Sequence, residues 1–249
     1  MLLTRLGVPR LWGEDPEALW RAMRFFVAPA TLWLAPGSFS YGVERVPPTG
    51  GAVVATNHLS AIDPPLIGTF CPRAVFYMAK AELLAIPVVG EILQWTGAFP
   101  VRRGEHDEEA MRRARRLVRE GHVVGMFVEG TRQRFGYPGP VHTGAMVIAM
   151  HEGVPIVPCG LESFRWSRRN RRPCAVVWGE PIRLDGLPRT EDGYREAAEI
   201  VGREILRLWR QAAEAIVAGF PAALPDGTRR SGPIPPGRHA ATASAAGRG

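Results

Sequence analysis

Cysteine is scarce in this chain, and the few cysteines are poorly spaced for a structural role. The 249 residues include three of them, Cys71, Cys159 and Cys174, which form no C-x-x-C pair. Scattered thiols in an odd number indicate neither a disulfide framework nor a zinc site, and they favour a reducing, cytosolic setting. The histidines also lack a metal-ligand spacing such as H-E-x-x-H. The sequence therefore predicts no metal.

Long apolar runs are absent too. The longest, Phe25 to Pro36, is too short to cross a bilayer and contains Pro29. The first residues also differ from a secretory signal, because Glu14 and Asp15 are acidic where a signal would be apolar. We therefore expect no membrane-spanning helix, while a helix that lies in the membrane interface stays open.

Lysine is almost missing as well. The net charge is +7, and Lys80 is the only lysine among many arginines. A basic chain favours an anionic partner, which could be nucleic acid, a phospholipid surface or a phosphorylated substrate. No signature of a nucleic-acid-binding module is present, so we expect no specific nucleic-acid partner. Because an ammonium and a guanidinium are not interchangeable, the single lysine becomes a candidate functional residue.

An amphipathic helix is predicted near the start of the chain. Asp15 and Pro16 favour a helix start, and Glu17 can pair with Arg21 one turn later. The apolar residues that follow are Leu19, Trp20, Met23, Phe26, Val27, Leu32, Trp33 and Leu34. They either pack on a core or anchor the protein in one leaflet, and we favour the anchor. Residues 1–44 are thus interpreted as an N-terminal amphipathic, membrane-associating helical segment.

The middle of the sequence alternates strand-like and helix-like patterns. Short β-branched runs predict strands at residues 52–55, 74–78, 123–128, 156–159 and 174–178. Helices are predicted at residues 105–120, just before Val154, and at 191–218. This alternation predicts an α/β fold, with a central, mostly parallel sheet flanked by helices, in one domain over residues 45–219. The composition then shifts to Gly, Pro, Ala, Ser and Arg, so residues 220–249 are expected to be a disordered tail.

A histidine and a carboxylate, His58 and Asp63, stand five positions apart just after the first predicted strand. A carboxylate can hold an imidazole in one tautomer and stabilise its protonated form, so that the imidazole can take a proton from a hydroxyl. In a continuous helix an offset of five places two side chains on different faces. The pair meets only if the chain turns, and a helix start at Asp63-Pro64-Pro65 favours such a turn. The alternative is a surface histidine beside a capping aspartate.

Three further blocks of sequence follow this pair. They are Lys80-Ala81-Glu82-Leu83 with the later Phe99-Pro100-Val101-Arg102-Arg103, then Phe127-Val128-Glu129-Gly130-Thr131-Arg132, and finally Val154-Pro155-Ile156-Val157-Pro158. Backbone amides freed by Gly130, the Thr131 hydroxyl and Arg132 suit a bound phosphate. Arg103 could supply a second, bidentate contact. The alternative is an ordinary turn with a surface ion pair between Glu129 and Arg132.

In this order and spacing the four blocks, over about residues 45 to 185, resemble the PlsC-like glycerolipid acyltransferases, which include the 1-acylglycerol-3-phosphate acyltransferases. That family shows N-H-x-x-x-x-D, a K-x-E-L to x-R block, F-P-E-G-T-R and V-P-[IV]-[VI]-P. The resemblance implies transfer of an acyl chain from acyl-CoA or acyl-carrier protein to the hydroxyl of a lysophospholipid. With 1-acylglycerol-3-phosphate as acceptor, the product is phosphatidic acid for phospholipid biosynthesis. No cofactor is implied beyond the acyl thioester co-substrate.

The resemblance also implies a location and roles for single residues. The protein would be peripheral or monotopic at the cytoplasmic face of the cell membrane, on an anionic surface. His58 would be the general base, Asp63 would orient it, and Asn57 would shape the loop. The residues implied to bind substrate are Lys80, Arg103, Glu129, Gly130, Thr131 and Arg132.

Two positions depart from the family pattern. Val128 replaces a proline, which affects local stiffness. His142 stands where relatives often have lysine, and a histidine is only partly charged at neutral pH. His142 is therefore a possible headgroup contact, while another lysophospholipid, a glycolipid or another lipid alcohol stays an alternative acceptor. A non-catalytic lipid-binding protein is a further alternative, although such a protein needs no base. The basic stretch 164–172 fits a solvated loop or an anionic bilayer surface, and we favour the bilayer.

Overall fold

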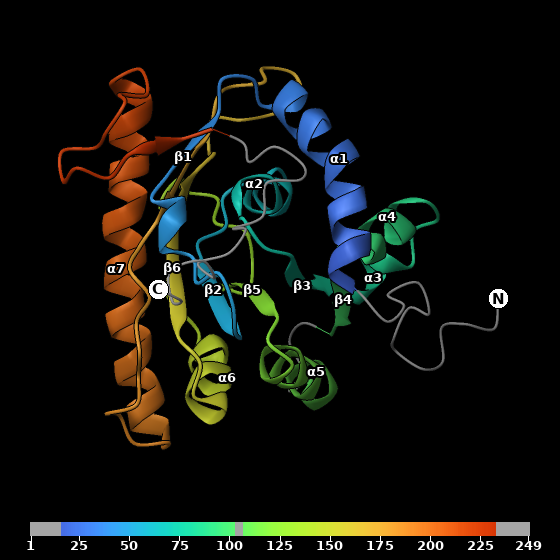
Figure 1. Cartoon of the computed structure of the whole chain (residues 1–249), viewed down its shortest axis with the longest axis vertical. Coiled ribbons are helices and arrows are strands. Elements are labelled where there is room, and N and C mark those ends of the chain that lie inside the picture. The colour runs from blue at the N-terminus through green and yellow to red at the C-terminus, as the bar shows by residue number, and fades with distance from the viewer. Residues whose placement is uncertain (1–15, 103–106, 233–249) are drawn as a thin grey trace, which may run out of the picture.

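The short apolar runs of the sequence form the strands of one sheet at the centre of the molecule (Figure 1). The computed structural model describes residues 16–102 and 107–232, and within them the sheet has eight strands in the order β4-β3-β5-β2-β6-β7-β1-β8. The strands are β1 (Phe39–Tyr41), β2 (Ala52–Thr56), β3 (Val75–Lys80), β4 (Ala98–Val101), β5 (Val123–Phe127), β6 (Ile156–Glu162), β7 (Ala175–Trp178) and β8 (Arg230–Ser231).

Most neighbouring strands are parallel. From β4 through β3, β5 and β2 to β6, every pair runs in the same direction, and Val54 of β2 lies between Gly125 of β5 and Val157 of β6. β7 is antiparallel to β6, β1 is parallel to β7, and β8 is antiparallel to β1. The predicted α/β fold with a mostly parallel sheet is therefore confirmed.

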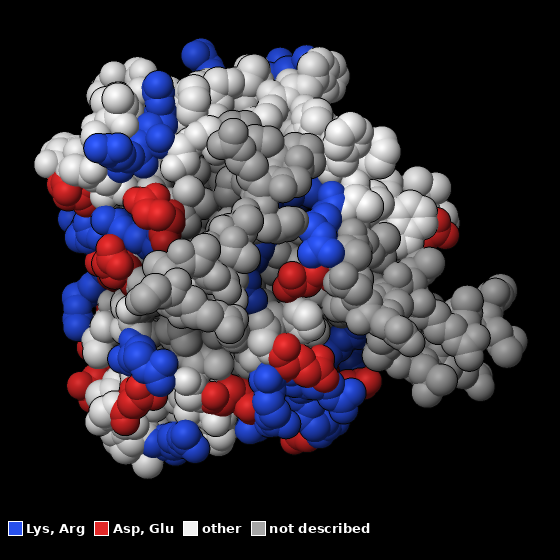
Figure 2. All heavy atoms as spheres, in the orientation of Figure 1, with Lys and Arg blue, Asp and Glu red and all other residues white. Residues whose placement is uncertain are grey.

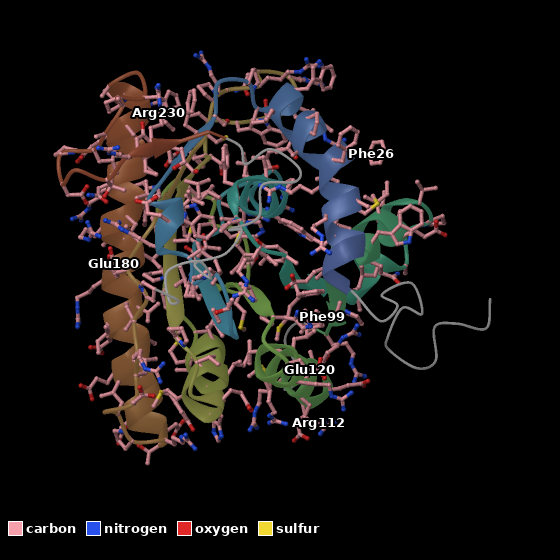
Figure 3. The ribbon with its side chains drawn as sticks, in the orientation of Figure 1. Phe26, Phe99, Arg112, Glu120, Glu180 and Arg230 are labelled. Carbon is pink, nitrogen blue, oxygen red and sulfur yellow. The ribbon has the colours of Figure 1, made fainter. Side chains whose placement is uncertain are left out.

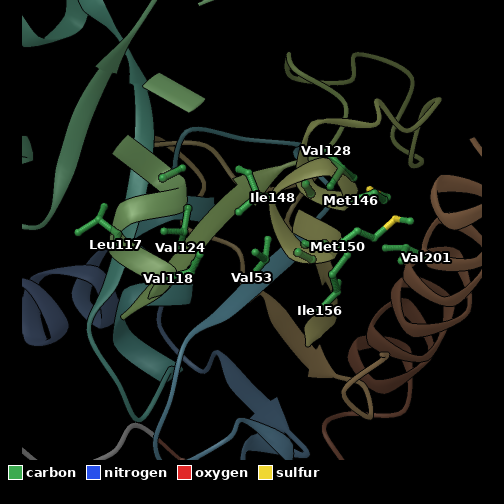
Figure 4. Close-up of a cluster of buried hydrophobic side chains, with 14 of the residues drawn as sticks. Val53, Leu117, Val118, Val124, Val128, Met146, Ile148, Met150, Ile156 and Val201 are labelled. Atoms are coloured by element: carbon green, nitrogen blue, oxygen red, sulfur yellow. The ribbon is translucent and has the colours of Figure 1, made fainter. Parts of the chain in front are cut away.

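Helices cover both faces of this sheet (Figure 1). They are α1 (Pro16–Leu34), α2 (Asp63–Phe70), α3 (Ala81–Leu84), α4 (Val89–Trp95), α5 (Glu108–Arg119), α6 (Gly144–Glu152) and α7 (Glu191–Val217), with a short 3-10 helix, η3 (Val43–Arg45). On one face Val53 belongs to the same core as Leu117 of α5 and Ile148 of α6 (Figure 4). On the other face Val54 belongs to a core with Phe70 of α2. Because both faces are covered, all residues of β2 are buried.

The domain extends beyond its predicted limits of 45–219. β1, inside the segment assigned to the N-terminal helix, is a strand of the sheet. Residues 220–232 were expected to be disordered, yet β8 pairs with β1 and Leu224 is buried. Tyr41 donates a hydrogen bond to the Pro221 carbonyl, and the Arg230 guanidinium lies over the Phe39 ring. This segment is held by backbone pairing and a few specific contacts. Amino-acid composition does not report such contacts, so it gave no sign that the segment is ordered. Residues 233–249 lie outside the described residues.

The first helix packs on the site-bearing half of the sheet. α1 begins at Pro16 and continues through Pro29 to Leu34, and it contacts α2. Its buried Arg24 guanidinium donates hydrogen bonds to the carbonyls of Cys71 and Thr69, at the end of α2. A cation at this position pairs with the carbonyls that a helix leaves free at its C-terminus. Among the described residues no helix is both long and apolar enough to cross a membrane.

Candidate active site

The candidate residues gather where parallel strands end. His58 follows β2, Glu129 follows β5, and Ser163 follows β6, and these three strands are neighbours in the sheet. The carboxyl ends of parallel strands meet at one edge, which is the usual place for a ligand site in such folds. Asn57 ties two of these ends together. Its side-chain amide donates to the Leu161 carbonyl and accepts from the Leu161 N–H, each at 2.8 Å.

His58 and Asp63 meet through a turn of the chain. The chain turns after His58, and Asp63 is the first residue of α2. The Nδ1 atom of His58 lies 2.8 Å from Oδ2 of Asp63. Since an ionised carboxylate only accepts hydrogen bonds, Nδ1 carries the proton in this contact. The other ring nitrogen, Nε2, is then the one that can take a proton from a substrate.

The Asp63 carboxylate is fully buried, and protein donors surround it. Besides the His58 ring, Oδ2 accepts hydrogen bonds from the backbone N–H groups of Leu59 (2.7 Å) and Ser60 (2.9 Å). Oδ1 accepts from the hydroxyls of Ser60 (2.9 Å) and Ser163 (2.5 Å). These contacts fix the carboxylate in position against the imidazole. Ser163 was not recognised in the sequence, where it follows Glu162 at the end of β6 and belongs to none of the motifs.

Aromatic rings pack against one face of the imidazole. The His58 ring stacks on Phe127 with 4.1 Å between ring centroids, and Phe127 stacks on Tyr77 at 5.8 Å. Gly125 makes room for this arrangement, because a Cβ at that position would lie 2.2 Å from the Tyr77 ring. The stack leaves His58 only 7% exposed.

Glu129 holds the backbone next to the histidine. Its Oε2 accepts a hydrogen bond from the His58 N–H (2.7 Å), and its Oε1 accepts from the Gly139 N–H (2.6 Å). Burial raises the pKa of this carboxyl to about 7, although the two N–H groups act in the opposite direction. The carboxyl group thus joins the His58 turn to the loop after β5, and it is only 3% exposed.

The loop after Glu129 folds back over the histidine. The Gln133 N–H donates to the His58 carbonyl at 2.8 Å, which places Arg132 in the same neighbourhood. Gly130 has a φ of 67°, and a Cβ there would lie 3.3 Å from the His142 ring. Gly130, Thr131, Arg132 and His142 are all exposed. Four of the predicted substrate-binding or headgroup residues therefore lie along one exposed loop.

The predicted substrate-binding residue Lys80 lies at the end of another strand. Lys80 is the last residue of β3, and its Nζ lies 3.2 Å from Oε1 of Glu82. Arg103 lies outside the described residues. Within residues 16–102 and 107–232, no group of three or more His, Cys, Asp or Glu side chains could hold a metal ion.

An apolar cavity opens beside the imidazole. Its volume is about 320 Å³, and His58, Phe127 and Lys80 are among the residues that line it. Most of its wall consists of apolar side chains from α1, α2, β3 and the α3–α4 pair, including Val27, Ala28, Pro64, Leu83, Ile92 and Leu93. A proton acceptor at the border of an apolar cavity suits a reaction on a substrate with an apolar chain.

Comparisons with known proteins find acyltransferases. A family model described as Acyltransferase matches residues 39–162. The 1-acyl-sn-glycerol-3-phosphate acyltransferase of Bacillus subtilis is 33% identical over 159 residues, which is 61% of this chain and 76% of that protein. The lyso-ornithine lipid O-acyltransferase of Pseudomonas aeruginosa is 28% identical over 205 residues, 78% of this chain and 77% of that protein.

A solved structure is also similar. It is the crystal structure of the 1-acyl-sn-glycerophosphate acyltransferase PlsC from Thermotoga maritima, with a TM-score of 0.63 and 26% identity. The match covers 76% of this chain and 79% of that one.

We predict that Ser163→Ala lowers kcat about tenfold and leaves KM nearly unchanged. The change removes one hydrogen bond to the charged Asp63 carboxylate, and such a bond contributes about 1.5 kcal/mol or more. Steady-state kinetics of the purified variant measure both constants. Ser163→Thr, which keeps the hydroxyl, should recover much of the rate, and Ser167→Ala on the exposed part of the same loop is the control. An unchanged kcat in Ser163→Ala would remove Ser163 from the site.

A second prediction concerns Glu129 and the pH dependence of stability. Between pH 4.5 and about 7 the unfolded chain loses this proton while the folded chain keeps it, so folding becomes less favourable as pH rises. Glu129→Gln should therefore show a smaller fall in melting temperature across this range than the parent protein. Glu120→Gln, at an exposed position, is the control. If the melting temperatures of the parent and Glu129→Gln fell equally with rising pH, the result would contradict the raised pKa of Glu129.

Proposed function

Because the chain belongs to the PlsC-like glycerolipid acyltransferase family, we propose that it transfers a fatty acyl chain from an acyl thioester to the free hydroxyl of 1-acylglycerol-3-phosphate. The product would be phosphatidic acid. One observation carries the proposal: the His58–Asp63 pair is fixed at the border of an apolar cavity. That arrangement combines a general base with room for an acyl chain.

The chemistry follows from the free nitrogen of His58. Nε2 takes the proton of the acceptor hydroxyl as its oxygen attacks the thioester carbonyl, and Asp63 stabilises the imidazolium that forms. The C–O bond forms, the C–S bond breaks, and the leaving thiolate takes the proton from the imidazolium. Direct transfer of this kind needs neither a covalent acyl-enzyme nor a metal. The donor would be acyl-CoA or acyl-carrier protein, with no resident cofactor.

The two substrates would approach His58 from different sides. The apolar cavity, with its wall of aliphatic side chains, suits a fatty acyl chain. The exposed loop that contains Gly130, Arg132 and His142 suits a phosphate-bearing headgroup, because it combines a guanidinium with a glycine in a turn. Lys80 lines the cavity and carries positive charge near the reacting centre.

We further propose that the protein works as a peripheral or monotopic protein on an anionic membrane, at the cytoplasmic face of the cell membrane. The support is the outward face of α1, which carries no charged residue between Ala22 and Trp33. Its exposed side chains are Ala22, Phe25, Phe26, Pro29, Ala30 and Trp33. An amphipathic helix with aromatic residues on its exposed apolar face is typical of interfacial membrane binding.

A lysolipid with another headgroup is a second candidate for the acceptor. His142 replaces the lysine that relatives often carry, and one relative acts, by its name, on a lyso-ornithine lipid. A lysolipid with a different headgroup is therefore an alternative acceptor for the same chemistry. A non-catalytic lipid-binding role is less favoured, because a binding protein has no use for a buried carboxylate that orients a histidine.

We predict that His58→Ala abolishes turnover, with a loss of at least a hundredfold, since the general base is removed. The measurement is release of free thiol from a long-chain acyl-CoA in the presence of lysophosphatidate. Circular dichroism and vesicle binding should match those of the parent protein, which separates loss of chemistry from loss of fold. His151→Ala is the control at a histidine remote from the cavity. A variant that keeps its rate without His58 would contradict the mechanism.

For the acceptor we predict that lysophosphatidate is acylated and that His142→Lys lowers its KM severalfold. A lysine carries a fixed positive charge that can attract the phosphate of the acceptor. Monoacylglycerol, which lacks the phosphate, is the matched control substrate and should show no such gain. Product only with lyso-ornithine lipid or another lysolipid would keep the mechanism and change the acceptor.

A further inference from the structure

A second exposed apolar surface lies next to α1, on the pair of short helices α3 and α4. The residues that join these helices are all exposed: Ala85, Ile86, Pro87, Val88 and Val89. In α4 itself Ile92 is also exposed, at 42%. In Figure 2 much of the surface where Figure 1 places the upper part of α1 and α4 is white, with acidic side chains at its edge, and Glu82 and Glu91 are exposed on the helix pair itself. An apolar surface of this kind, on two adjoining elements, indicates an interaction site.

The tip of this helix pair is strained. The Val89 N–H donates to the Pro87 carbonyl at 2.7 Å, which closes a three-residue γ-turn around Val88. Val88 has a φ of 65° and a ψ of −51°, a conformation that is costly for a β-branched residue. Gly90 allows the tight return, because a Cβ there would lie 2.1 Å from the Leu84 carbonyl oxygen. A strained turn that presents a 65% exposed valine indicates a functional constraint on this tip.

The same helix pair separates the cavity from the surface by a single layer of side chains. Leu83 and Ile92 both line the cavity beside His58 and are exposed, at 44% and 42%. Val27 and Ala28 of α1 line the cavity as well, and Phe26, next to them in sequence, points outward (Figure 3). The apolar outer surface and the apolar cavity are therefore two sides of one thin wall.

Positive charge lies at the C-terminal end of α1, whereas α4 lies near the N-terminal end of that helix (Figure 1). Trp166 donates a hydrogen bond from its ring N–H to the Leu34 carbonyl, and Arg171 lies over the Trp33 ring at 3.7 Å. The loop held there has no acidic residue between positions 163 and 173, and its exposed arginines are Arg165, Arg168, Arg169 and Arg172. An apolar surface bordered by arginines matches an anionic lipid bilayer.

We propose that the tip of the α3–α4 pair, residues 85–89, inserts into an anionic bilayer as a second contact beside α1. This inference rests on the membrane-associated acyltransferase function proposed above, and it adds the element that brings the cavity wall into contact with the hydrocarbon. The lipid, and not a second copy of the chain, is the occupant because the exposed apolar face of α1 links this surface to the cationic loop at residues 164–172, and because Leu83 and Ile92 of the helix pair line an apolar cavity.

Depth-dependent quenching tests the proposal directly. Val88→Cys, Phe26→Cys and Val217→Cys are labelled with an environment-sensitive fluorophore and added to phosphatidylglycerol vesicles that carry bromine on the acyl chains. The three native cysteines are buried and should not label in the folded protein. We expect at least twofold quenching at positions 88 and 26, and none at Val217, which is 89% exposed on α7 across the molecule.

Each other outcome has a definite meaning. Quenching at 26 without quenching at 88 would overturn the proposal and leave membrane binding by α1 intact. No quenching at either position would remove membrane contact altogether, and a fluorescence change at 88 that follows protein concentration would assign the surface to a second copy. Thiol release from acyl-CoA, measured on the same labelled proteins, reports separately on the proposed reaction.

A pair of substitutions tests the energetic contribution of the tip. Val88→Asn suits the positive φ better than valine and removes an apolar side chain. It should weaken binding to phosphatidylglycerol vesicles about tenfold, because burial of one valine contributes about 1.5 kcal/mol. Val217→Asn removes the same side chain from α7 and should leave vesicle binding unchanged. Equal effects from the two variants would overturn the assignment.

Discussion

The site depends on one buried negative charge. Asp63 is fully buried, and a carboxylate without water is tolerated only when protein donors replace its hydration. The chain supplies them locally, since the turn from His58 to Ser60 directs a ring N–H, two backbone N–H groups and a hydroxyl at the carboxylate. The position of Asp63 at the start of α2 adds the favourable end of the helix dipole. The conformation of the turn and the charge of the carboxylate therefore stabilise each other.

His58 itself is held by three different residues. Asp63 fixes the imidazole ring, Glu129 accepts the His58 N–H, and Gln133 donates to the His58 carbonyl. The loop after β5 is thereby attached to the same residue as the start of α2. Movement of either segment would displace His58. A fixed imidazole suits the proposed role of general base, because the geometry of proton transfer tolerates little error.

Sequence reasoning succeeded where the determining contacts are local. The alternation of apolar runs predicted the α/β fold, and the helix start at Asp63 predicted the turn that joins His58 to it. Ser163 could not be predicted, because it meets Asp63 only through the adjacency of β2 and β6 across 100 positions. The contact of Glu129 with the Gly139 N–H likewise depends on how a long loop folds back. β8 was missed because backbone pairing with β1 holds it, and composition does not report such pairing.

The burial of His58 has a consequence for selectivity between transfer and hydrolysis. A base able to activate a lipid hydroxyl can also activate water, and the activated water would hydrolyse the thioester. The stack of His58 on Phe127 and the surrounding loop leave the imidazole 7% exposed, so bulk water has limited access to it. In the proposed reaction an acyl chain would fill the apolar cavity and exclude water from the remaining side. Selectivity for the lipid hydroxyl would then follow from packing around His58 and would need no additional catalytic group.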